Sequence, residues 1–155
     1  MNKLEYLRMQ AAMRTELVAI APNLMITHNF GGMYKAETAK KRMLSFYTAV
    51  QSHVFGRRWA TQYDRPWPVA YGCREHPTTN PHYHVLARAC PLLTGAIEND
   101  GSGLWLTKVP HGQLDVRAID PGELGPIIYC TKHLTHAQTF DDMFVYNDTR
   151  KHAPA

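Results

Sequence analysis

The stretch that decides the fold runs from residue 67 to residue 89 and reads WPVAYGCREHPTTNPHYHVLARA. Two extended runs flank the turn-forming residues 77–80, Pro-Thr-Thr-Asn, the first running from Trp67 to His76 and the second beginning at His82. A break of that length between two such runs predicts a β-hairpin. Side chains on a strand alternate between its faces, so His82 and His84 should share one face. The other face should point into the core and carry Tyr83, Val85, Ala87 and Ala89.

The histidine pair is a candidate metal site. If residues 77–80 form the loop, Glu75 lies directly across from His82 on the same face and supplies a carboxylate. Two imidazoles and a carboxylate leave positions open for water and phosphate. Such a set suits a divalent ion such as Mn²⁺ or Mg²⁺ acting as a Lewis acid, and zinc would also accept these ligands. The alternative is a half-exposed strand with two ordinary histidines, since a chain with nine histidines often contains one His-x-His by chance.

A second candidate segment follows the histidines along the chain. After residues 120–122, Asp-Pro-Gly, a helix is expected to run to about His136. At about 3.6 residues per turn, Tyr129, Lys132, His133 and His136 form one polar stripe. This stripe would place a potential nucleophile and a lysine above a metal-bearing sheet, the alternative being an amphipathic helix with an ordinary basic face. The opposite, aliphatic face would consist of Leu124, Ile127, Ile128, Thr131 and Leu134.

These motifs together resemble the HUH endonucleases, which nick single-stranded DNA in rolling-circle replication and in single-strand transposition. The resemblance rests on His82-Tyr83-His84 and on the Tyr-x-x-Lys spacing from Tyr129 to Lys132. The strand over residues 24–30, LMITHNF, is also similar to the N-terminal motif of that family. The resemblance implies a single domain over residues 1–155, with an N-terminal helix over about 1–20 and a catalytic core over about 20–140.

The resemblance also implies a mechanism. A tyrosine hydroxyl is a poor nucleophile at neutral pH unless a base or a nearby cation favours the phenolate. With a metal polarising the scissile phosphate, Tyr129 would attack in line and leave a 5′-phosphotyrosine link and a free 3′-hydroxyl. Lys132 would hold the phosphate or position the nucleophile, and the alternative is a solvated surface lysine. The Tyr-x-x-Lys spacing resembles the initiators of rolling-circle replication in plasmids, phages and small circular DNA viruses.

The third metal ligand has two candidates. A glutamate seven residues before the first histidine occurs in viral members of the family, and Glu75 matches it. In the single-strand transposases the third ligand usually comes four residues after the tyrosine, where this chain has His133. We favour Glu75, because the hairpin argument reaches it independently, and keep His133 as the rival.

Four functions are therefore compared. The first is a site-specific, single-stranded DNA endonuclease and strand transferase that initiates rolling-circle replication. An HUH-type transposase is its nearest relative in chemistry. The third is a metal-dependent phosphoesterase that forms no covalent link to tyrosine, and the fourth is a catalytically idle DNA-binding module.

The expected partner is single-stranded DNA at an origin or a hairpin nick site. A formal charge of +4 and a pI near 9.0 fit such a partner without requiring it. Because the sequence contains no Gly-x-x-x-x-Gly-Lys-Ser/Thr motif, a separate helicase and host replication proteins would have to act with it. Arginines at the end of a helix can equally complement its dipole. The candidate DNA contacts are Thr27, Asn29, Lys40, Lys41, Arg57 and Arg58.

Composition and targeting signals set the broad class. A chain of 155 residues that is 45% hydrophobic is sufficient for one domain with one core. Cys73, Cys90 and Cys130 are widely spaced and indicate neither a disulfide framework nor a zinc knuckle. No signal sequence or membrane span is evident, so the expected location is the cytoplasm, or the host nucleus for a eukaryotic virus.

The remaining elements complete an α+β fold. Helices are expected over residues 1–20 and 35–54, strands over 104–109 and 113–119, and a short strand near 143–146. Short connections favour a central antiparallel sheet of about four to five strands flanked by helices, with a ferredoxin-like or RRM-like core as in replication initiators. Trp59, Trp67 and Trp105 are expected in the core or at a sheet edge, with stacking on an unpaired base as the alternative.

Overall fold

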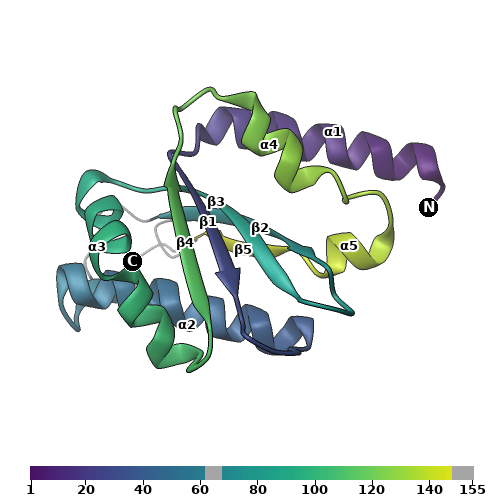
Figure 1. Cartoon of the computed structure of the whole chain (residues 1–155). Helices are drawn as coiled ribbons and strands as arrows, with labels where there is room; N and C mark the ends of the chain where they lie inside the picture. Colours follow the sequence, from purple (N-terminus) through teal and green to yellow (C-terminus); the bar gives the residue numbers. More distant parts are fainter. Residues whose placement is uncertain (62–67, 148–155) are drawn as a thin grey trace.

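The computed structural model of the chain describes residues 1–61 and 68–147 (Figure 1). Its five strands form one antiparallel sheet in the order β4-β1-β3-β2-β5, with helices on both faces. The predicted α+β class with a central antiparallel sheet is therefore confirmed. The elements in chain order are α1 (Lys3–Ile20), β1 (Leu24–Asn29), α2 (Ala36–Phe55), a 3-10 turn (Trp59–Thr61), β2 (Val69–Glu75), β3 (His82–Arg88), α3 (Pro91–Lys108), β4 (Gln113–Ala118), α4 (Leu124–Thr131), α5 (Ala137–Asp141) and β5 (Phe144–Asn147).

The predicted hairpin is formed by β2 and β3. In their register Glu75 is opposite His82 and Cys73 is opposite His84, as the four-residue loop requires. The Thr79 amide donates to the His76 carbonyl at 3.3 Å and closes the turn. Trp67, the expected start of the first strand, lies outside the described residues.

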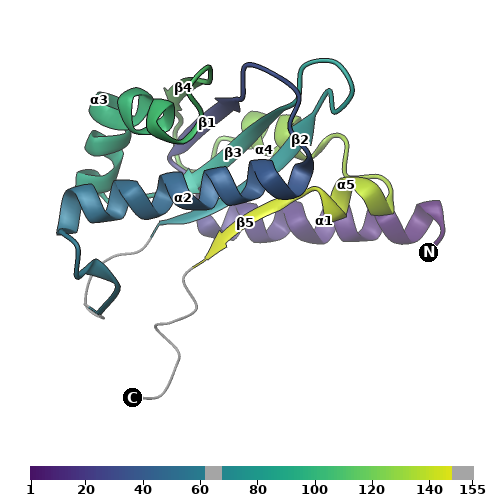
Figure 2. The same cartoon turned by 90° about the horizontal axis from the view of Figure 1, so that it is seen from below.

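The two faces of the sheet are covered by different pairs of helices (Figures 1 and 2). On one face α2 and α3 pack on the side chains of β3 that alternate with the histidines, and this is the larger core. On the other face α1 and α4 pack around Leu86, whose side chain lies on the same face of β3 as that of His84. The larger core includes Met43, Phe46, Tyr47, Tyr83, Val85, Leu93, Ile97 and Trp105. The smaller core consists of Leu17, Leu86, Ile119, Ile127 and Cys130.

The predicted strand over residues 104–109 is wrong, because most of that segment is the last turn of α3. Three glycines in α3, at positions 95, 101 and 103, interrupt the apolar spacing of the helix, while Leu104-Trp105-Leu106 is equally compatible with a strand. Trp105 is fully buried, and its indole donates to the Asn29 carbonyl at 3.0 Å. Trp59 is also buried, so both described tryptophans lie in the protein interior, as expected.

The helix predicted to follow residues 120–122 begins as expected but is wrong at its C-terminal end, which was expected near His136. α4 begins at Leu124 and ends at Thr131, and a second short helix, α5, begins after His136. The Thr131 carbonyl, which would accept from the next turn of a longer helix, instead accepts from Gln10 Nε2 of α1 at 2.8 Å. Of the expected aliphatic face, Ile127, Thr131 and Leu134 are buried, but Leu124 and Ile128 are exposed.

No helix among residues 1–61 and 68–147 combines the length and the hydrophobicity needed to cross a membrane. The short predicted strand near residues 143–146 is present as β5, which pairs with β2 at one edge of the sheet. The expected helices over residues 1–20 and 35–54 are present as α1 and α2 within one or two residues at each end.

Candidate metal and nucleophile site

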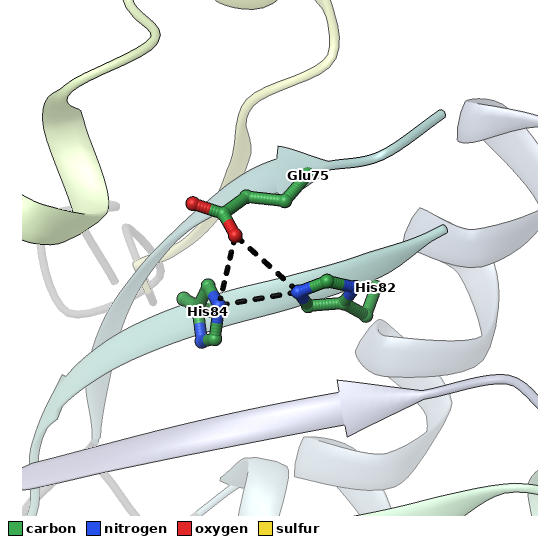
Figure 3. A group of neighbouring side chains, drawn as sticks. All are labelled: Glu75, His82 and His84. Atoms are coloured by element: carbon green, nitrogen blue, oxygen red, sulfur yellow. Dashed lines mark hydrogen bonds and ion pairs between the residues drawn. The ribbon is translucent and has the colours of Figure 1, made fainter. Parts of the chain in front are cut away.

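Three side chains converge where β2 and β3 meet the turn between them (Figure 3). His82 Nε2 and His84 Nε2 are 3.2 Å apart, and Glu75 Oε2 lies 3.4 Å from the first and 3.3 Å from the second. An ion about 2.1 Å from two donors that subtend ~90–110° at it holds them roughly 3.0–3.5 Å apart. These three atoms form a triangle, called the ligand triangle below, whose sides match that spacing. The Glu75-His82-His84 group could therefore hold a metal ion.

Hydrogen bonds hold both imidazoles with Nε2 facing the triangle. His82 Nδ1 lies 2.9 Å from the Asn80 carbonyl oxygen, which can only accept. That ring therefore carries its proton on Nδ1 and presents a free lone pair on Nε2. His84 Nδ1 lies 3.0 Å from Thr27 Oγ1 of β1, an arrangement consistent with the same tautomer. Ring nitrogens fixed in this way by a second polar group are typical of metal-binding histidines.

Electrostatics favour the protonation states that bind cations. Burial alone would raise the pKa of Glu75, but the hydrogen bond from Lys132 and the nearby His84 outweigh it and lower the pKa. Burial lowers the pKa of His84, and Glu75 opposes that shift only in part. The carboxylate is thus ionised and the imidazole neutral near neutral pH, which are the forms that coordinate a metal.

Tyr129 and Lys132 lie on the same face of the sheet as the histidines. The Tyr129 ring centroid is 5.1 Å from that of His84, and the residue is 43% exposed, so its ring faces the cluster from the solvent side. Lys132 Nζ stands 3.7 Å from the Tyr129 ring centroid and 2.9 Å from Glu75 Oε1. The hydrogen bond to Glu75 is the main cause of the raised pKa of Lys132.

The two later histidines have different positions. His133 Nε2 is 3.7 Å from Glu75 Oε1, the carboxylate oxygen that faces away from the other histidines, and its side chain is more than half exposed. His136 caps the start of α5. Glu75 belongs to the ligand triangle, whereas His133 approaches its outer side. The predicted stripe therefore reaches the cluster through Tyr129, Lys132 and His133, although α4 itself ends before the lysine.

The six predicted DNA contacts fall into two groups. Thr27 and Asn29 lie in β1 beside His84 and His82, and Thr27 hydrogen-bonds to His84. The four basic residues lie in α2 or in the exposed turn after it, and α2 packs on the opposite face of the sheet. Lys40 donates to the Asp141 carbonyl, and Lys41 pairs with Glu37 at 2.9 Å. The structure thus does not bring Lys40, Lys41, Arg57 and Arg58 to the cluster.

Sequence reasoning named Thr27 only as a DNA contact, and it missed two features of the site. One is the hydroxyl of Thr27, which orients His84. The other is Arg117 of β4, which shares a hollow of about 300 Å³ with Tyr129. The alternation of polar residues in the expected strand over 113–119 could have shown that Arg117 is on an exposed face. Its placement beside the tyrosine depends on the pairing of β4 with β1, which no local pattern encodes.

The fold and the site together define an α+β protein with a potential metal centre beside an exposed tyrosine and lysine. Comparison of the chain with protein-family models, with curated proteins and with solved structures finds no match.

Proposed function

We propose that this protein is a metal-dependent, site-specific nicking endonuclease and strand transferase of single-stranded DNA, of the HUH type. The observation that carries the proposal is the position of the Tyr129 ring, 5.1 Å from the ring of His84 and on the same face as the ligand triangle. An exposed phenol beside a potential metal centre is the arrangement needed for attack on a phosphodiester.

The residues divide the chemistry among them. Glu75, His82 and His84 would hold Mn²⁺ or Mg²⁺, which supplies stabilisation of negative charge on the phosphoryl oxygens. Tyr129 forms a bond from its phenolic oxygen to phosphorus as the bond from phosphorus to the 3′-oxygen breaks. The phenol proton passes to solvent, and the 3′-oxygen leaves and takes up a proton. The product is a 5′-phosphotyrosine link beside a free 3′-hydroxyl.

Lys132 has two functions in this proposal. Its ammonium group, 3.7 Å from the centroid of the Tyr129 ring, positions the nucleophile. The same group can also contact an oxygen of the bound phosphate. Its link to Glu75 holds it between the nucleophile and the ligand triangle.

The covalent link suits a replication initiator. It conserves the energy of the phosphodiester, so reversal by a 3′-hydroxyl rejoins the strand without ATP. We infer that the protein nicks an origin or a hairpin to start rolling-circle replication, and that a separate helicase and host replication proteins extend the product. An HUH-type transposase would use the same chemistry, and flanking transposon ends in the neighbouring DNA would distinguish it.

A metal-dependent phosphoesterase is the second candidate. The observation that favours it is that Glu75 also lines a hollow that contains His76, His133 and His136, through which water could reach the ion. In that case water would be the nucleophile, a metal held by Glu75, His82 and His84 would supply its activation, and Tyr129 would take no part.

A trapping experiment distinguishes these functions. A pool of random-sequence, single-stranded DNA oligonucleotides labelled at the 3′ end is incubated with Mn²⁺ and separated on a denaturing gel. We expect labelled protein from the wild type and from the control Tyr6→Phe, and none from Tyr129→Phe. Cleavage that persists in Tyr129→Phe would favour the phosphoesterase, and binding without cleavage would favour an idle DNA-binding module.

A further inference from the structure

The sheet face that carries the ligand triangle is open to solvent along β4. On this face α4 packs on β3 and β2 and against α1. β4 forms the other edge of the sheet, and its three side chains on this face, Gln113, Asp115 and Arg117, are all exposed. In Figure 1, α1 and α4 lie together above β2 and β3, whereas β4 runs along the near edge of the sheet.

This open surface is continuous with the metal site. Asp115 is the register partner of Thr27, and Thr27 is in turn the partner of His84. Three adjacent strands therefore place a carboxylate, a hydroxyl and a ligand imidazole in one row. The next row places Arg117 beside Met25, close to the tyrosine.

Two hollows lie along the open surface. The first, of about 300 Å³, is lined by Met25, Arg117, Glu123, Gly125, Pro126 and Tyr129. The second, of about 500 Å³, lies at the β4 edge of the sheet and is lined by Thr27, Asn29, Gln113, Leu114 and Asp115 of β1 and β4, by Ser102 and Leu106 of α3, and by Gly112. Each has the volume of a small-ligand pocket.

The two hollows differ in charge and therefore in what they bind. In the first, the formal charge of the Glu123 carboxylate is balanced by the Arg117 guanidinium, and this guanidinium beside the Tyr129 ring suits a phosphate and its attached base. Among the described residues that line the second hollow there is a carboxylate and no lysine or arginine. That carboxylate repels a backbone phosphate but accepts hydrogen bonds from the amino group of a base.

From this geometry we infer that the open face of β4 is the substrate-reading surface of the protein. Arg117 holds a backbone phosphate next to the scissile one, and Asp115 selects a nearby base that carries an exocyclic amino group. Adenine, cytosine and guanine carry such a group, whereas the one donor of an unpaired thymine, its N3–H, is flanked by two carbonyl oxygens that a carboxylate repels, so thymine is disfavoured at this position. The inference rests on the proposed function and explains which residues would give the nuclease its sequence preference.

The role of Arg117 is tested by DNA binding at several salt concentrations. The full chain carrying Tyr129→Phe is titrated with labelled random-sequence single-stranded DNA, so that no covalent capture contributes. Arg117→Ala in this background should weaken binding about fivefold for all sequences and reduce the salt slope by about 0.7, as expected for one lost phosphate contact on a single strand. The control Arg42→Ala removes an exposed arginine from α2 and should change neither quantity.

The role of Asp115 is tested by selection. The Tyr129→Phe protein is used to enrich bound molecules from the same random pool, which are then sequenced. We expect thymine to be depleted about fivefold at one position, and Asp115→Asn to abolish that depletion, because an amide also donates to the thymine carbonyl. Glu98→Gln, which neutralises an exposed acid on α3, should leave the depletion intact.

Failure of this inference can be distinguished from failure of the proposed function. If the wild type forms the covalent adduct but Arg117→Ala and Asp115→Asn behave like their controls, the inference is wrong and the nuclease proposal stands. If both variants change binding as expected and no adduct forms, the open face reads single-stranded DNA but the protein is not a nicking enzyme.

Discussion

Two neighbouring strands carry histidines on opposite faces of one sheet, and their surroundings differ completely. His28 of β1 is fully buried among Phe46, Tyr47 and Trp105. His84 of β3 faces the other way, toward a carboxylate, a second imidazole and the ring of Tyr129. The same residue type thus serves as a packed core side chain on one face and as a potential ligand on the other.

The contrast lies in the partners of the ring nitrogens. In the core, His28 Nε2 contacts the Tyr47 hydroxyl at 3.1 Å, and Nδ1 has no hydrogen-bond partner among the described residues. Burial lowers the pKa of His28 to about 3. For His84, Nδ1 is held by Thr27 and Nε2 faces Glu75 and His82. Convergent polar partners, rather than the presence of histidine alone, distinguish the candidate site.

The largest expected effect is on Mn²⁺ affinity, and it should differ between the two histidines. His84→Ala removes one of three ligands and should lower the affinity for Mn²⁺ more than about 100-fold, measured by calorimetric titration. His28→Gln should leave that affinity within about twofold of the wild type, provided that the variant is folded by circular dichroism. Equal losses in the two variants would show that both histidines act only through the fold.

The second prediction concerns the third ligand. Glu75→Ala should weaken Mn²⁺ binding by between about 10- and 100-fold, because its Oε2 completes the triangle. His133→Ala should weaken it less than about threefold, since His133 reaches only the outer oxygen of that carboxylate. The same titration measures both variants, and the opposite order would move the third ligand to His133.

The third prediction concerns the buried histidine, His28, and the pH dependence of folding stability. The pKa of His28 is lower in the folded chain than in the unfolded chain, so the unfolded state binds the proton first as pH falls. The contribution of His28 to stability is complete above pH 6.5 and is lost progressively as the pH falls from 6.5 toward 3. Between pH 7 and pH 5 this loss is about 2 kcal/mol.

Urea unfolding at the two pH values measures that loss. His28→Gln has no titrating ring, so its unfolding free energy should decrease by about 2 kcal/mol less than that of the wild type. Other groups, including Glu75, add their own losses in the same direction, and the difference between the two proteins removes them. An identical decrease in both would mean that His28 is protonated in the folded state or is not buried.

The smallest expected effect concerns the support of His84. Thr27→Val keeps the shape of the side chain but removes the hydroxyl that holds Nδ1. Mn²⁺ affinity should fall about tenfold, as expected for the loss of a group that orients a ligand. Thr48→Val, on the exposed side of α2, is the matched control and should have no effect. Unchanged Mn²⁺ affinity in Thr27→Val would show that the hydroxyl of Thr27 has no role in metal binding.

Local sequence patterns were sufficient for the hairpin that holds the ligands. The loop length fixed the register of β2 and β3, and strand alternation then placed Glu75 beside His82 and His84. Those relations involve residues fewer than ten positions apart, so turn geometry and side-chain periodicity determine them.

The features that were missed depend on contacts between distant parts of the chain. The end of α4 is set by Gln10, a residue 121 positions away. The hydroxyl of Thr27 reaches His84 only because β1 pairs with β3, and Arg117 reaches the tyrosine only because β4 pairs with β1. In α3, burial of Trp105 against Asn29 and the core outweighs the weak helical tendency of three glycines.

The central claim is that Tyr129 forms the covalent bond to DNA. It is tested most directly by proteolysis of the protein after reaction with single-stranded DNA and Mn²⁺, followed by mass spectrometry of the peptides. The proposal predicts a nucleotide joined through its 5′-phosphate to the peptide that contains Tyr129. A nucleotide on a different residue, or cleaved DNA with no modified peptide, would contradict it.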